Sequence, residues 1–248
     1  MDQGRPDDSI ADALTAASGG GCPPRAPPGD AIAANLCVII PTLNAAATLA
    51  ETLAALGRVP EIIVVDGASS DATVAIAAAS GAVVLTAPRG RGSQLAAGVA
   101  AATQPWLLLL HADTRLAPDW RAAAQLAPAQ AGYFRFCLDA PDHQARRLER
   151  LVAWRNWFFG LPYGDQGLLI HRDLLRAAGG VRPLPLMEDV DLVRRLGRAR
   201  LVPLAADAVT SARKWREQGY LRRSARNLVC VSLWFAGVPP RLIQLLYQ

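Results

Sequence analysis

The stretch that decides the fold is LCVII at residues 36–40, a continuous apolar run that Pro41 ends. A short apolar run of this kind, bounded by a turn residue, is typical of a strand buried on both faces of a parallel sheet. Similar runs follow at residues 61–65, 82–85 and 106–110. The sequence therefore predicts four parallel strands in the first half of the chain.

The segments between these strands carry apolar residues at helical spacing. They predict helices at residues 48–56, 71–80 and 93–103. Strand and helix thus alternate, which is typical of an α/β fold with a mostly parallel central sheet flanked by helices. Further along, the pattern predicts strands at 133–138, 167–170 and 199–203, and helices at 144–159, 172–178 and 190–196.

Composition divides the chain into three parts. Residues 1–34 contain a glycine triplet and two proline pairs without periodic apolar residues, so we predict a flexible low-complexity tail. Residues 35–219 form the predicted α/β domain. Residues 220–248 form a basic, amphipathic helical region that Pro239 and Pro240 interrupt.

The overall composition narrows the class of protein. With 52% hydrophobic residues the chain has ample material for a core, which excludes a wholly disordered protein. The formal net charge is +5, and all but one of the 26 Lys and Arg residues are arginine. Arginine favours phosphate and carboxylate ligands, so nucleotides, anionic lipids or nucleic acids are compatible partners. Codon bias in an alanine-rich chain explains the charge equally well.

The cysteines and the N-terminal segment give no indication of a zinc site, a secretory signal or a membrane span. The four cysteines are scattered and form no CxxC pair, so the sequence predicts no zinc site. We find neither a secretory signal pattern nor a run of about 20 apolar residues, so we expect a cytoplasmic protein.

Polar side chains follow the predicted strands where each one ends. These residues are Asn44, Asp66, Arg89, Arg91 and Asp113. Ligands of parallel α/β sheets bind beyond the carboxyl ends of the strands. The sequence therefore predicts a binding site at this edge of the sheet.

Two motifs there are compatible with nucleotide binding. DGASSD at residues 66–71 places Asp66 at the end of a strand and Asp71 at the start of a helix, although a turn with a helix cap explains it too. PRGRGS at residues 88–93 combines two glycines with Arg89 and Arg91 before a helix, which suits an anion. A solvated turn is an equal alternative for the second motif.

Three further motifs carry carboxylates. In HADT (111–114), Asp113 can bind a divalent cation with diphosphate oxygens, or can simply form a turn. In LMEDVD (186–191), a positioned carboxylate can accept a proton from a hydroxyl, or the cluster can stabilise the first helical turn. YGDQG (163–167) is either a loop that presents Asp165 and Gln166 to a polyhydroxyl ligand or an ordinary turn.

Taken together, these motifs resemble the family-2 glycosyltransferases of GT-A fold over roughly residues 36–200. The matching stretches are VIIPTLN (38–44), IVVDGASSD (63–71), LLHADT (109–114) and MED (187–189). More narrowly, LPYGDQG (161–167) and LPLMED (184–189) look like a bacterial subgroup described as radical-SAM-associated or arsenosugar-biosynthesis glycosyltransferases.

The resemblance implies a function and a set of site residues. It implies an inverting transfer of a sugar from a nucleoside diphosphate sugar, UDP rather than GDP by analogy, to an acceptor hydroxyl. Asp189 would be the general base in the Glu188-Asp189 motif, and Asp165 and Gln166 would bind the acceptor. Asp113 would hold Mg²⁺ or Mn²⁺ with His111, which stands where the family usually has aspartate. The implied nucleotide pocket comprises Pro41, Thr42, Asn44, Asp66, Asp71, Arg89 and Arg91.

The sequence is compatible with other functions. A sugar nucleotidyltransferase would need a glycine-rich loop after the first strand, where this chain has PTLN at residues 41–44. A non-catalytic nucleotide-binding protein is compatible with His111. Nucleic-acid binding is not expected, because no recognised module accompanies the basic and aromatic residues at 215–220.

The basic C-terminal region has two interpretations. Arg222, Arg223 and Arg226 precede an apolar stretch, which would suit peripheral contact with an anionic membrane at its inner face. Alternatively, the helix packs on the sheet while its arginines are solvated or line the acceptor cleft. We favour this second interpretation.

Overall fold

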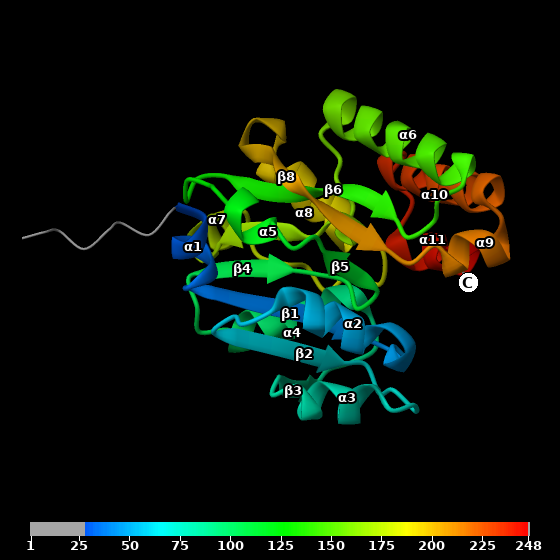
Figure 1. The fold of residues 1–248 in the computed structure, drawn as a ribbon. Coiled ribbons are helices and arrows are strands. Elements are labelled where there is room, and N and C mark those ends of the chain that lie inside the picture. Colours follow the sequence, from blue (N-terminus) through cyan, green and yellow to red (C-terminus); the bar gives the residue numbers. More distant parts are fainter. Residues whose placement is uncertain (1–27, 248) are drawn as a thin grey trace, which may run out of the picture.

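The computed structural model describes residues 28–247, which form helices on both sides of one sheet (Figure 1). The strands are β1 (Leu36–Thr42), β2 (Glu61–Asp66), β3 (Val83–Thr86), β4 (Trp106–Leu109), β5 (Thr114–Leu116), β6 (Ala131–Leu138), β7 (Leu168–His171) and β8 (Leu201–Thr210). The helices are α1 (Pro28–Ala33), α2 (Ala46–Leu56), α3 (Thr73–Ala79), α4 (Arg91–Ala101), α5 (Trp120–Ala123), α6 (His143–Phe159), α7 (Arg172–Ala177), α8 (Glu188–Leu196), α9 (Arg213–Gln218), α10 (Tyr220–Phe235) and α11 (Pro240–Tyr247), with 3₁₀ turns at Gly164–Gln166 and Arg198–Arg200.

The strand order confirms the predicted mostly parallel α/β sheet. The order is β3-β2-β1-β4-β7-β6-β8-β5. The pairs β2–β3, β1–β2, β1–β4 and β6–β8 are parallel, whereas β4–β7, β6–β7 and β5–β8 are antiparallel. β2 and β3 lie on one side of β1 and β4 lies on the other, so the strand order switches between β1 and β4, where the crevice for a ligand is expected.

Strand β1 is enclosed on both faces. Val38 and Ile40 contribute to a core cluster that also contains residues of α2, α3 and α5. Cys37 and Ile39 belong to a second cluster with residues of α4, α7 and α8. Because successive side chains of a strand point to opposite faces, helices on both sides bury the whole run and leave polar residues only at its ends.

The structure differs from the sequence prediction in several elements. Part of the predicted tail, Pro28–Ala33, is helix α1, and Ile32 and Ala33 are buried in the core. The rest of that segment, residues 1–27, lies outside the described residues. β5, α5 and α9, which span three, four and six residues, were not predicted. β8 is longer than predicted, because residues 207–210 continue the pairing with β6 and residues 208–210 also pair with β5.

The C-terminal helices pack against α8 and the segment before it, whereas the favoured interpretation placed them on the sheet. Cys230 of α10 and Ile243 of α11 are both fully buried in a cluster with Leu186, Met187 and Val190. Among residues 28–247, no helix combines the length and the hydropathy needed to cross a bilayer.

Helix α4 approaches the sheet closely at Gly98. A β-carbon at this position would lie 2.4 Å from Ile39 Cγ2 and 3.0 Å from Val65 Cγ2. The small residue therefore sets the distance between α4 and the strands β1 and β2, and with it the position of the start of α4.

We predict that Gly98→Ala destabilises the fold by about 1–3 kcal/mol, because the added methyl group overpacks the contact with Ile39 and Val65. Helix propensity alone gives the opposite sign, a stabilisation of about 1 kcal/mol. The free energy of unfolding, measured by equilibrium urea unfolding, shows whether overpacking or helix propensity dominates. Ala100→Gly, at an exposed position of the same helix, controls for propensity; a more stable Gly98→Ala variant would contradict the close contact.

Candidate functional site

The turn after β2 is held by the carboxylate of Asp66. Its Oδ1 accepts hydrogen bonds from Thr42 Oγ1 (2.9 Å) and Ser69 Oγ (2.5 Å), and its Oδ2 accepts one from the Ser69 amide (2.7 Å). The hydrogen bonds from Ser69 and Thr42 outweigh the effect of burial and lower the pKa of Asp66. The carboxylate is therefore ionised and fixes the geometry of this turn, with 3% of Asp66 exposed.

Asp71 and Asn44 connect the same turn to the loop after β1. The Asn44 side chain accepts a hydrogen bond from the Ser70 amide (2.9 Å), and the Asn44 amide donates one to Ser69 Oγ (2.8 Å). Asp71 accepts hydrogen bonds from the amides of Ala46 (3.1 Å) and Thr73 (3.0 Å). Asn44 adopts φ 50°, a left-handed conformation that asparagine tolerates better than most residues. These two loops form one wall.

Gln94 is a buried positioning residue that the sequence analysis missed. Its Nε2 donates to the backbone oxygens of Thr42 and Val65, both at 2.7 Å. The amide thus joins the carboxyl ends of β1 and β2 to the first turn of α4. The sequence does not indicate this role for Gln94, which directly follows the PRGRGS turn, because its partner Thr42 is 52 residues away along the chain.

Arg91 at the start of α4 forms an ion pair with Glu188 at the start of α8. Arg91 Nε lies 2.8 Å from Glu188 Oε1, and only 1% of the Glu188 side chain is exposed. Burial raises the pKa of Glu188 to about 7, while Arg91 opposes the shift and Asp189 adds to it. The pair joins two segments that are nearly one hundred residues apart in the sequence.

His111 lies next to this pair, directly after β4. Its Nε2 is 3.4 Å from Arg91 Nη1. Burial, together with the positive charge of Arg91, lowers the pKa of His111 to about 4. The imidazole is therefore neutral near pH 7 and retains a lone pair that can accept a hydrogen bond or coordinate a cation.

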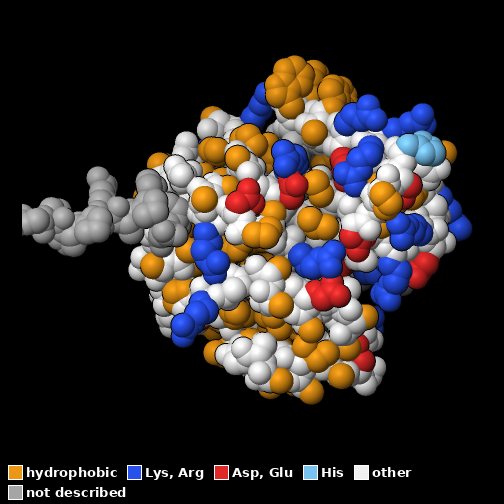
Figure 2. All heavy atoms as spheres, in the orientation of Figure 1, with side chains coloured by type: hydrophobic (Ala, Val, Ile, Leu, Met, Phe, Trp, Pro, Cys, Tyr) orange, Lys and Arg blue, Asp and Glu red, His pale blue; other side chains and the backbone are white. Residues whose placement is uncertain are grey.

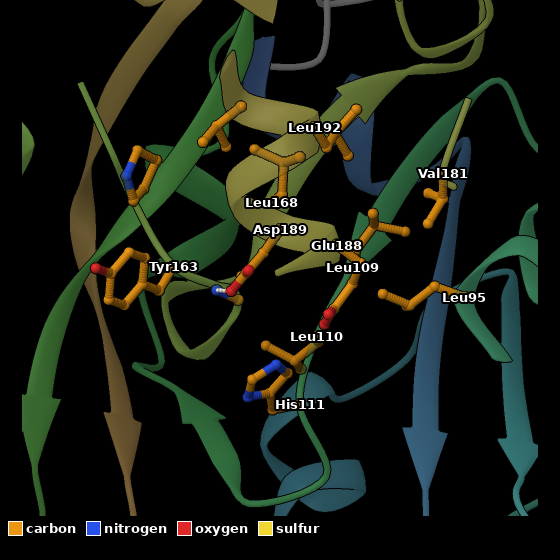
Figure 3. Close-up of a pocket in the computed structure, with 14 residues that line it drawn as sticks. Leu95, Leu109, Leu110, His111, Tyr163, Leu168, Val181, Glu188, Asp189 and Leu192 are labelled. Atoms are coloured by element: carbon orange, nitrogen blue, oxygen red, sulfur yellow. Dashed lines mark hydrogen bonds between the residues drawn. The ribbon is translucent and has the colours of Figure 1, made fainter. Parts of the chain in front are cut away.

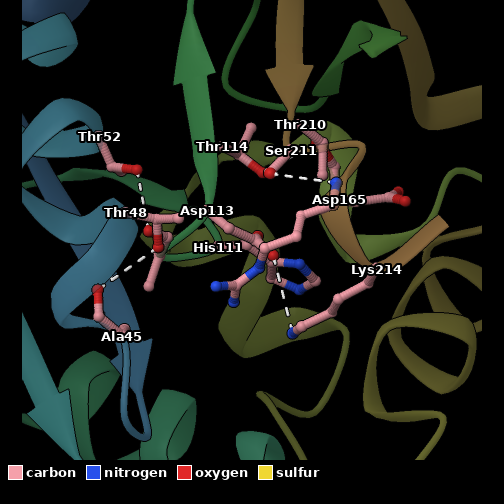
Figure 4. Close-up of polar contacts among 12 residues, drawn as sticks. Ala45, Thr48, Thr52, His111, Asp113, Thr114, Asp165, Thr210, Ser211 and Lys214 are labelled. Carbon is pink, nitrogen blue, oxygen red and sulfur yellow. Dashed lines mark hydrogen bonds and ion pairs between the residues drawn. The ribbon is translucent and has the colours of Figure 1, made fainter. Parts of the chain in front are cut away.

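Asp113 and Lys214 face each other across the site (Figure 4). Lys214 Nζ, from α9, lies 4.0 Å from Asp113 Oδ2, and 27% of the Asp113 side chain is exposed. An exposed pair at this distance contributes little to stability. The Asp113 carboxylate is thus accessible and can exchange its contact with Lys214 for a ligand.

Asp189 is oriented by two backbone amides. Its Oδ2 accepts from Gly164 (2.8 Å) and its Oδ1 from Val190 (2.8 Å). Figure 3 shows Glu188 and Asp189 at the start of α8, with Asp189 turned towards the loop of Tyr163. Met187, which precedes them, adopts φ 67°, a conformation that costs a non-glycine residue about 1–2 kcal/mol. Strain of this kind persists where the surrounding structure enforces a particular geometry.

The two residues of the predicted acceptor loop lie in different environments. Asp165 lines the site, and burial raises its pKa to about 6. Gln166 is 1% exposed and is used within the fold: its Nε2 donates to Phe134 O (2.9 Å) and its Oε1 accepts from Asn156 Nδ2 (3.0 Å). The structure therefore assigns Gln166 to the support of the loop and not to the site.

Two adjoining cavities meet at these residues. The β1-side cavity, about 890 Å³, is bounded by the loop after β1 and the turn before α4; its lining includes Pro41, Thr42, Asn44 and Arg89. The α10-side cavity, about 420 Å³, is bounded by α8, α9 and α10; its lining includes Asp165 and Asp189. Both are lined by Arg91, His111, Asp113, Leu186, Ser211 and Lys214.

The predicted site residues thus fall into three groups. Most of them line one or both cavities. Glu188 lies beneath them, beside a small apolar cavity of about 30 Å³ that also contacts His111 and Asp189 (Figure 3). Asp66, Asp71 and Gln166 lie behind the lining, where they hold its loops.

Lys214, the single lysine of the chain, was not predicted as a site residue. The one feature of the sequence that could have indicated a role for Lys214 is that every other basic residue among the Lys and Arg is arginine. Arg223 and Arg226, considered above for a membrane surface, line the α10-side cavity.

Two side chains at the junction of the cavities, those of Asp113 and His111, can coordinate a divalent cation. No group of three or more His, Cys, Asp or Glu residues is arranged to hold a metal ion within residues 28–247. The accessible carboxylate of Asp113 and the neutral imidazole of His111 offer two donors. Mg²⁺ and similar ions are commonly bound by one or two protein ligands plus substrate phosphates, and the residues present fit that mode.

Comparison with known sequences supports the resemblance. Residues 37–168, more than half of the chain, match the family model described as Glycosyl transferase family 2. Uncharacterized glycosyltransferases of Mycobacterium tuberculosis and Mycobacterium bovis are 42% identical over 86 residues. That stretch covers 34% of this chain and 38% of each relative, so the match spans well under half of their length.

Comparison with solved structures establishes the fold. Glucosyl-3-phosphoglycerate synthase from Mycobacterium tuberculosis, in complex with Mn²⁺ and UDP-glucose, matches with a TM-score of 0.58 at 20% identity, over 85% of this chain and 84% of that one. The mannosyltransferase PcManGT from Pyrobaculum calidifontis, with GDP-mannose and Mn²⁺, matches with a TM-score of 0.57 at 20% identity, over 79% and 62%. The predicted GT-A architecture is thereby confirmed.

We predict that Arg91→Gln destabilises the chain by about 1–3 kcal/mol at pH 8, because Glu188 then remains buried without its partner. Arg91 lowers the pKa of Glu188, so its removal raises that pKa further above the ordinary value of 4.5. A carboxyl with a raised folded-state pKa favours the fold when protonated and loses that contribution as the pH rises. The loss should therefore be much smaller at pH 5.

Urea unfolding at pH 5 and pH 8 measures this dependence. Arg91→Gln/Glu188→Gln is the matched control, since it removes the buried charge together with its partner and should recover most of the stability at pH 8. Equal destabilisation by Arg91→Gln at both pH values would contradict a buried, ionised Glu188.

Proposed function

The chain belongs to glycosyl transferase family 2, and from this we propose that it transfers a sugar from a nucleoside diphosphate sugar to an acceptor hydroxyl. The observation that carries the proposal is the meeting of two cavities at Arg91, His111 and Asp113. A transferase must hold two substrates on either side of the reacting bond, and two separate cavities joined at a charged strip meet that requirement.

The β1-side cavity is the proposed donor site. Pro41, Thr42 and Asn44 line it at the ends of the parallel strands, and Arg89 lines it from the turn before α4. Arginines beside a helix N-terminus favour phosphate groups. Asp66 and Asp71 support this wall through the loops they tie together. We infer a UDP-sugar as donor; similar structures contain UDP-glucose or GDP-mannose, so GDP is the alternative.

Asp113 and His111 are the residues proposed to hold a divalent metal ion, Mn²⁺ or Mg²⁺. Two of the similar structures contain Mn²⁺ with a nucleotide sugar. A bound ion would neutralise charge on the leaving diphosphate. Arg91 and Lys214 line the same junction and supply positive charge from the protein itself. Positioning and charge stabilisation would therefore provide most of the rate.

Asp189 is the proposed general base. Each of its oxygens accepts one backbone hydrogen bond, and each retains a lone pair for the acceptor hydroxyl. The carboxylate would take the hydroxyl proton as the oxygen attacks the anomeric carbon opposite the leaving diphosphate. A single displacement of this kind inverts the configuration. Glu188 would position Asp189 through its ion pair with Arg91.

We also propose the narrower assignment to the radical-SAM-associated, arsenosugar-type bacterial subgroup. What supports it is the location of its two motifs. Residues of 161–167 and of 184–189 line the α10-side cavity, including Tyr163, Asp165 and Asp189. With this assignment we propose that the enzyme acts in the cytoplasm, where nucleotide sugars are supplied.

Calorimetric titration with UDP and GDP, with and without Mn²⁺, tests the donor site. We expect metal-dependent binding of one nucleotide to the wild-type chain. Asp113→Ala should remove the metal dependence, with affinity at least tenfold weaker in the presence of Mn²⁺, because the carboxylate is the accessible anionic donor at the junction.

Asp189→Asn is the reciprocal variant: it should bind the nucleotide as the wild type does and lose transfer by about 10³-fold or more. A folded chain that binds no nucleotide would overturn the proposal in favour of a non-catalytic protein. Transfer retained by Asp189→Asn would refute Asp189 as the base.

Peripheral membrane contact is a separate proposal for the C-terminal region. Leu221 and Leu228 of α10 are 88% and 67% exposed, and the aromatic end of α6 carries exposed Trp157. In the view of Figure 2, hydrophobic side chains project at the top of the molecule, near α6, and blue Lys and Arg side chains lie beside them. Exposed apolar and basic residues together favour an anionic lipid surface.

Flotation with phosphatidylglycerol-containing vesicles tests this contact. We expect the full chain to float and Leu221→Ser/Leu228→Ser to float several-fold less, because both side chains would be inserted among lipids. Vesicles of phosphatidylcholine alone are the control. If the wild-type chain stays with the soluble fraction in both cases, the membrane proposal fails.

A further inference from the structure

We propose that the α10-side cavity contains a binding subsite for an anionic group, a phosphate or a carboxylate, carried by the acceptor. The subsite consists of Arg223, Arg226 and Lys214. This inference rests on the proposed function, because it makes the acceptor a molecule with both a nucleophilic hydroxyl and an anionic group. It concerns α9 and α10, which lie beyond the region matched by the family model.

Two guanidinium groups converge on one neutral oxygen. Arg223 Nη1 lies 3.2 Å and Arg226 Nη2 lies 2.8 Å from Gln218 Oε1. Two like charges held at a shared neutral acceptor repel each other, and water screens them less where they are partly buried. A bound anion would remove that repulsion and accept charge-assisted hydrogen bonds from both groups.

Arg223 is held on a packed aromatic platform. Its guanidinium carbon lies 4.8 Å from the centre of the Trp215 ring, and Trp215 stacks with Tyr220 at 6.1 Å. Trp215 is buried in a cluster with Phe136 and Leu138. The guanidinium is thus fixed before any ligand arrives, which reduces the entropy lost on binding.

Arg223 also has a donor that the protein leaves unused. Its Nε is buried and has no hydrogen-bond partner within residues 28–247. The same part of the chain offers it no carboxylate at ion-pair distance. Asn227, one helical turn further on, lines the same cavity, and its buried Oδ1 also lacks a partner there. Buried polar groups without partners are rare in folded proteins, and a bound ion or water is one explanation for them.

Charge is separated along the α10-side cavity. Asp165 lies in the 3₁₀ turn Gly164–Gln166 and Asp189 lies in α8, whereas Arg223 and Arg226 come from α10; Lys214 of α9 is paired with Asp113 at 4.0 Å. An acceptor with a hydroxyl at one end and an anionic group at the other matches this polarity. The volume of about 420 Å³ lies within the usual range for small-molecule sites, about 300–1,000 Å³.

The two arginines are separate from the proposed donor site. Arg89 and Arg91 line the β1-side cavity, but Arg223 and Arg226 line only the α10-side cavity. Phosphates of a nucleotide in the β1-side cavity already have Arg89 and Arg91 beside them. The anion at Arg223 and Arg226 therefore belongs to the second substrate.

Inorganic phosphate is the probe for this subsite. Full-length protein is titrated with phosphate by calorimetry, with UDP and Mn²⁺ present so that the β1-side cavity is filled. We expect saturable binding that weakens at least tenfold in Arg223→Gln/Arg226→Gln and less than twofold in Arg222→Gln. Arg222 is an exposed neighbour on the same helix that does not line the cavity, so it controls for the loss of positive charge.

Two further variants keep the test decisive. Arg223→Lys/Arg226→Lys keeps both charges and should retain more phosphate binding than the glutamine pair. If the glutamine pair does not fold, Arg226→Gln alone preserves the contact between Arg223 and Trp215 and should still weaken phosphate at least threefold. Phosphate binding that is absent from the wild type, or unchanged in the glutamine variants, overturns the subsite.

The outcome is distinguishable from a failure of the proposed function. UDP affinity is measured on the same variants and should not change; loss of UDP binding in the wild type would overturn the donor site, in which case phosphate is titrated without nucleotide. Vesicles of phosphatidylcholine with and without phosphatidic acid identify the source of the anion. Arg223-dependent binding to phosphatidic acid indicates a lipid headgroup, and binding of free phosphate alone indicates a soluble acceptor.

Discussion

The burial of β1 on both faces is the constraint on which the rest of the structure depends. Residues 36–40 are all inaccessible to solvent, with α2 and α3 on one side and α4 on the other. A polar side chain in such a strand would lose its hydration without compensation. Polar chemistry is therefore confined to the point where the strand leaves the core, and the loops after β1, β2 and β4 bring it together there.

The ion pair of Arg91 with Glu188 joins this edge to the second half of the molecule. A buried ion pair contributes little net stability, because desolvation offsets the attraction. The role of the ion pair between Arg91 and Glu188 is to position two helices relative to each other. It fixes the start of α8 against the start of α4, so that Asp189 faces Gly164 and lies beside His111. The strained backbone at Met187 is consistent with a geometry that the surrounding structure enforces.

The packing of the C-terminal helices places two of their arginines on a cavity instead of on the open surface. On sequence alone, Arg223 and Arg226 are surface charges on an amphipathic helix. In the structure the burial of Cys230 and Ile243 anchors α10 and α11 beside α8, and this packing places both arginines on a cavity. The region outside the family model thereby becomes a wall of the site, and its positive charge lies opposite the carboxylates of Asp113 and Asp189.

The sequence by itself determined the parallel half of the sheet, its flanking helices and three residues at the junction, Arg91, His111 and Asp113, because apolar periodicity and strand-end polar residues are local signals. It could not separate Asp165 from Gln166, which are neighbours in one loop with opposite environments. It also missed Gln94 and Lys214, and it placed the tail boundary beyond α1. Each of these depends on a contact between segments distant in the sequence. Only tertiary packing decides which side chain is buried by its partners and which faces the ligand.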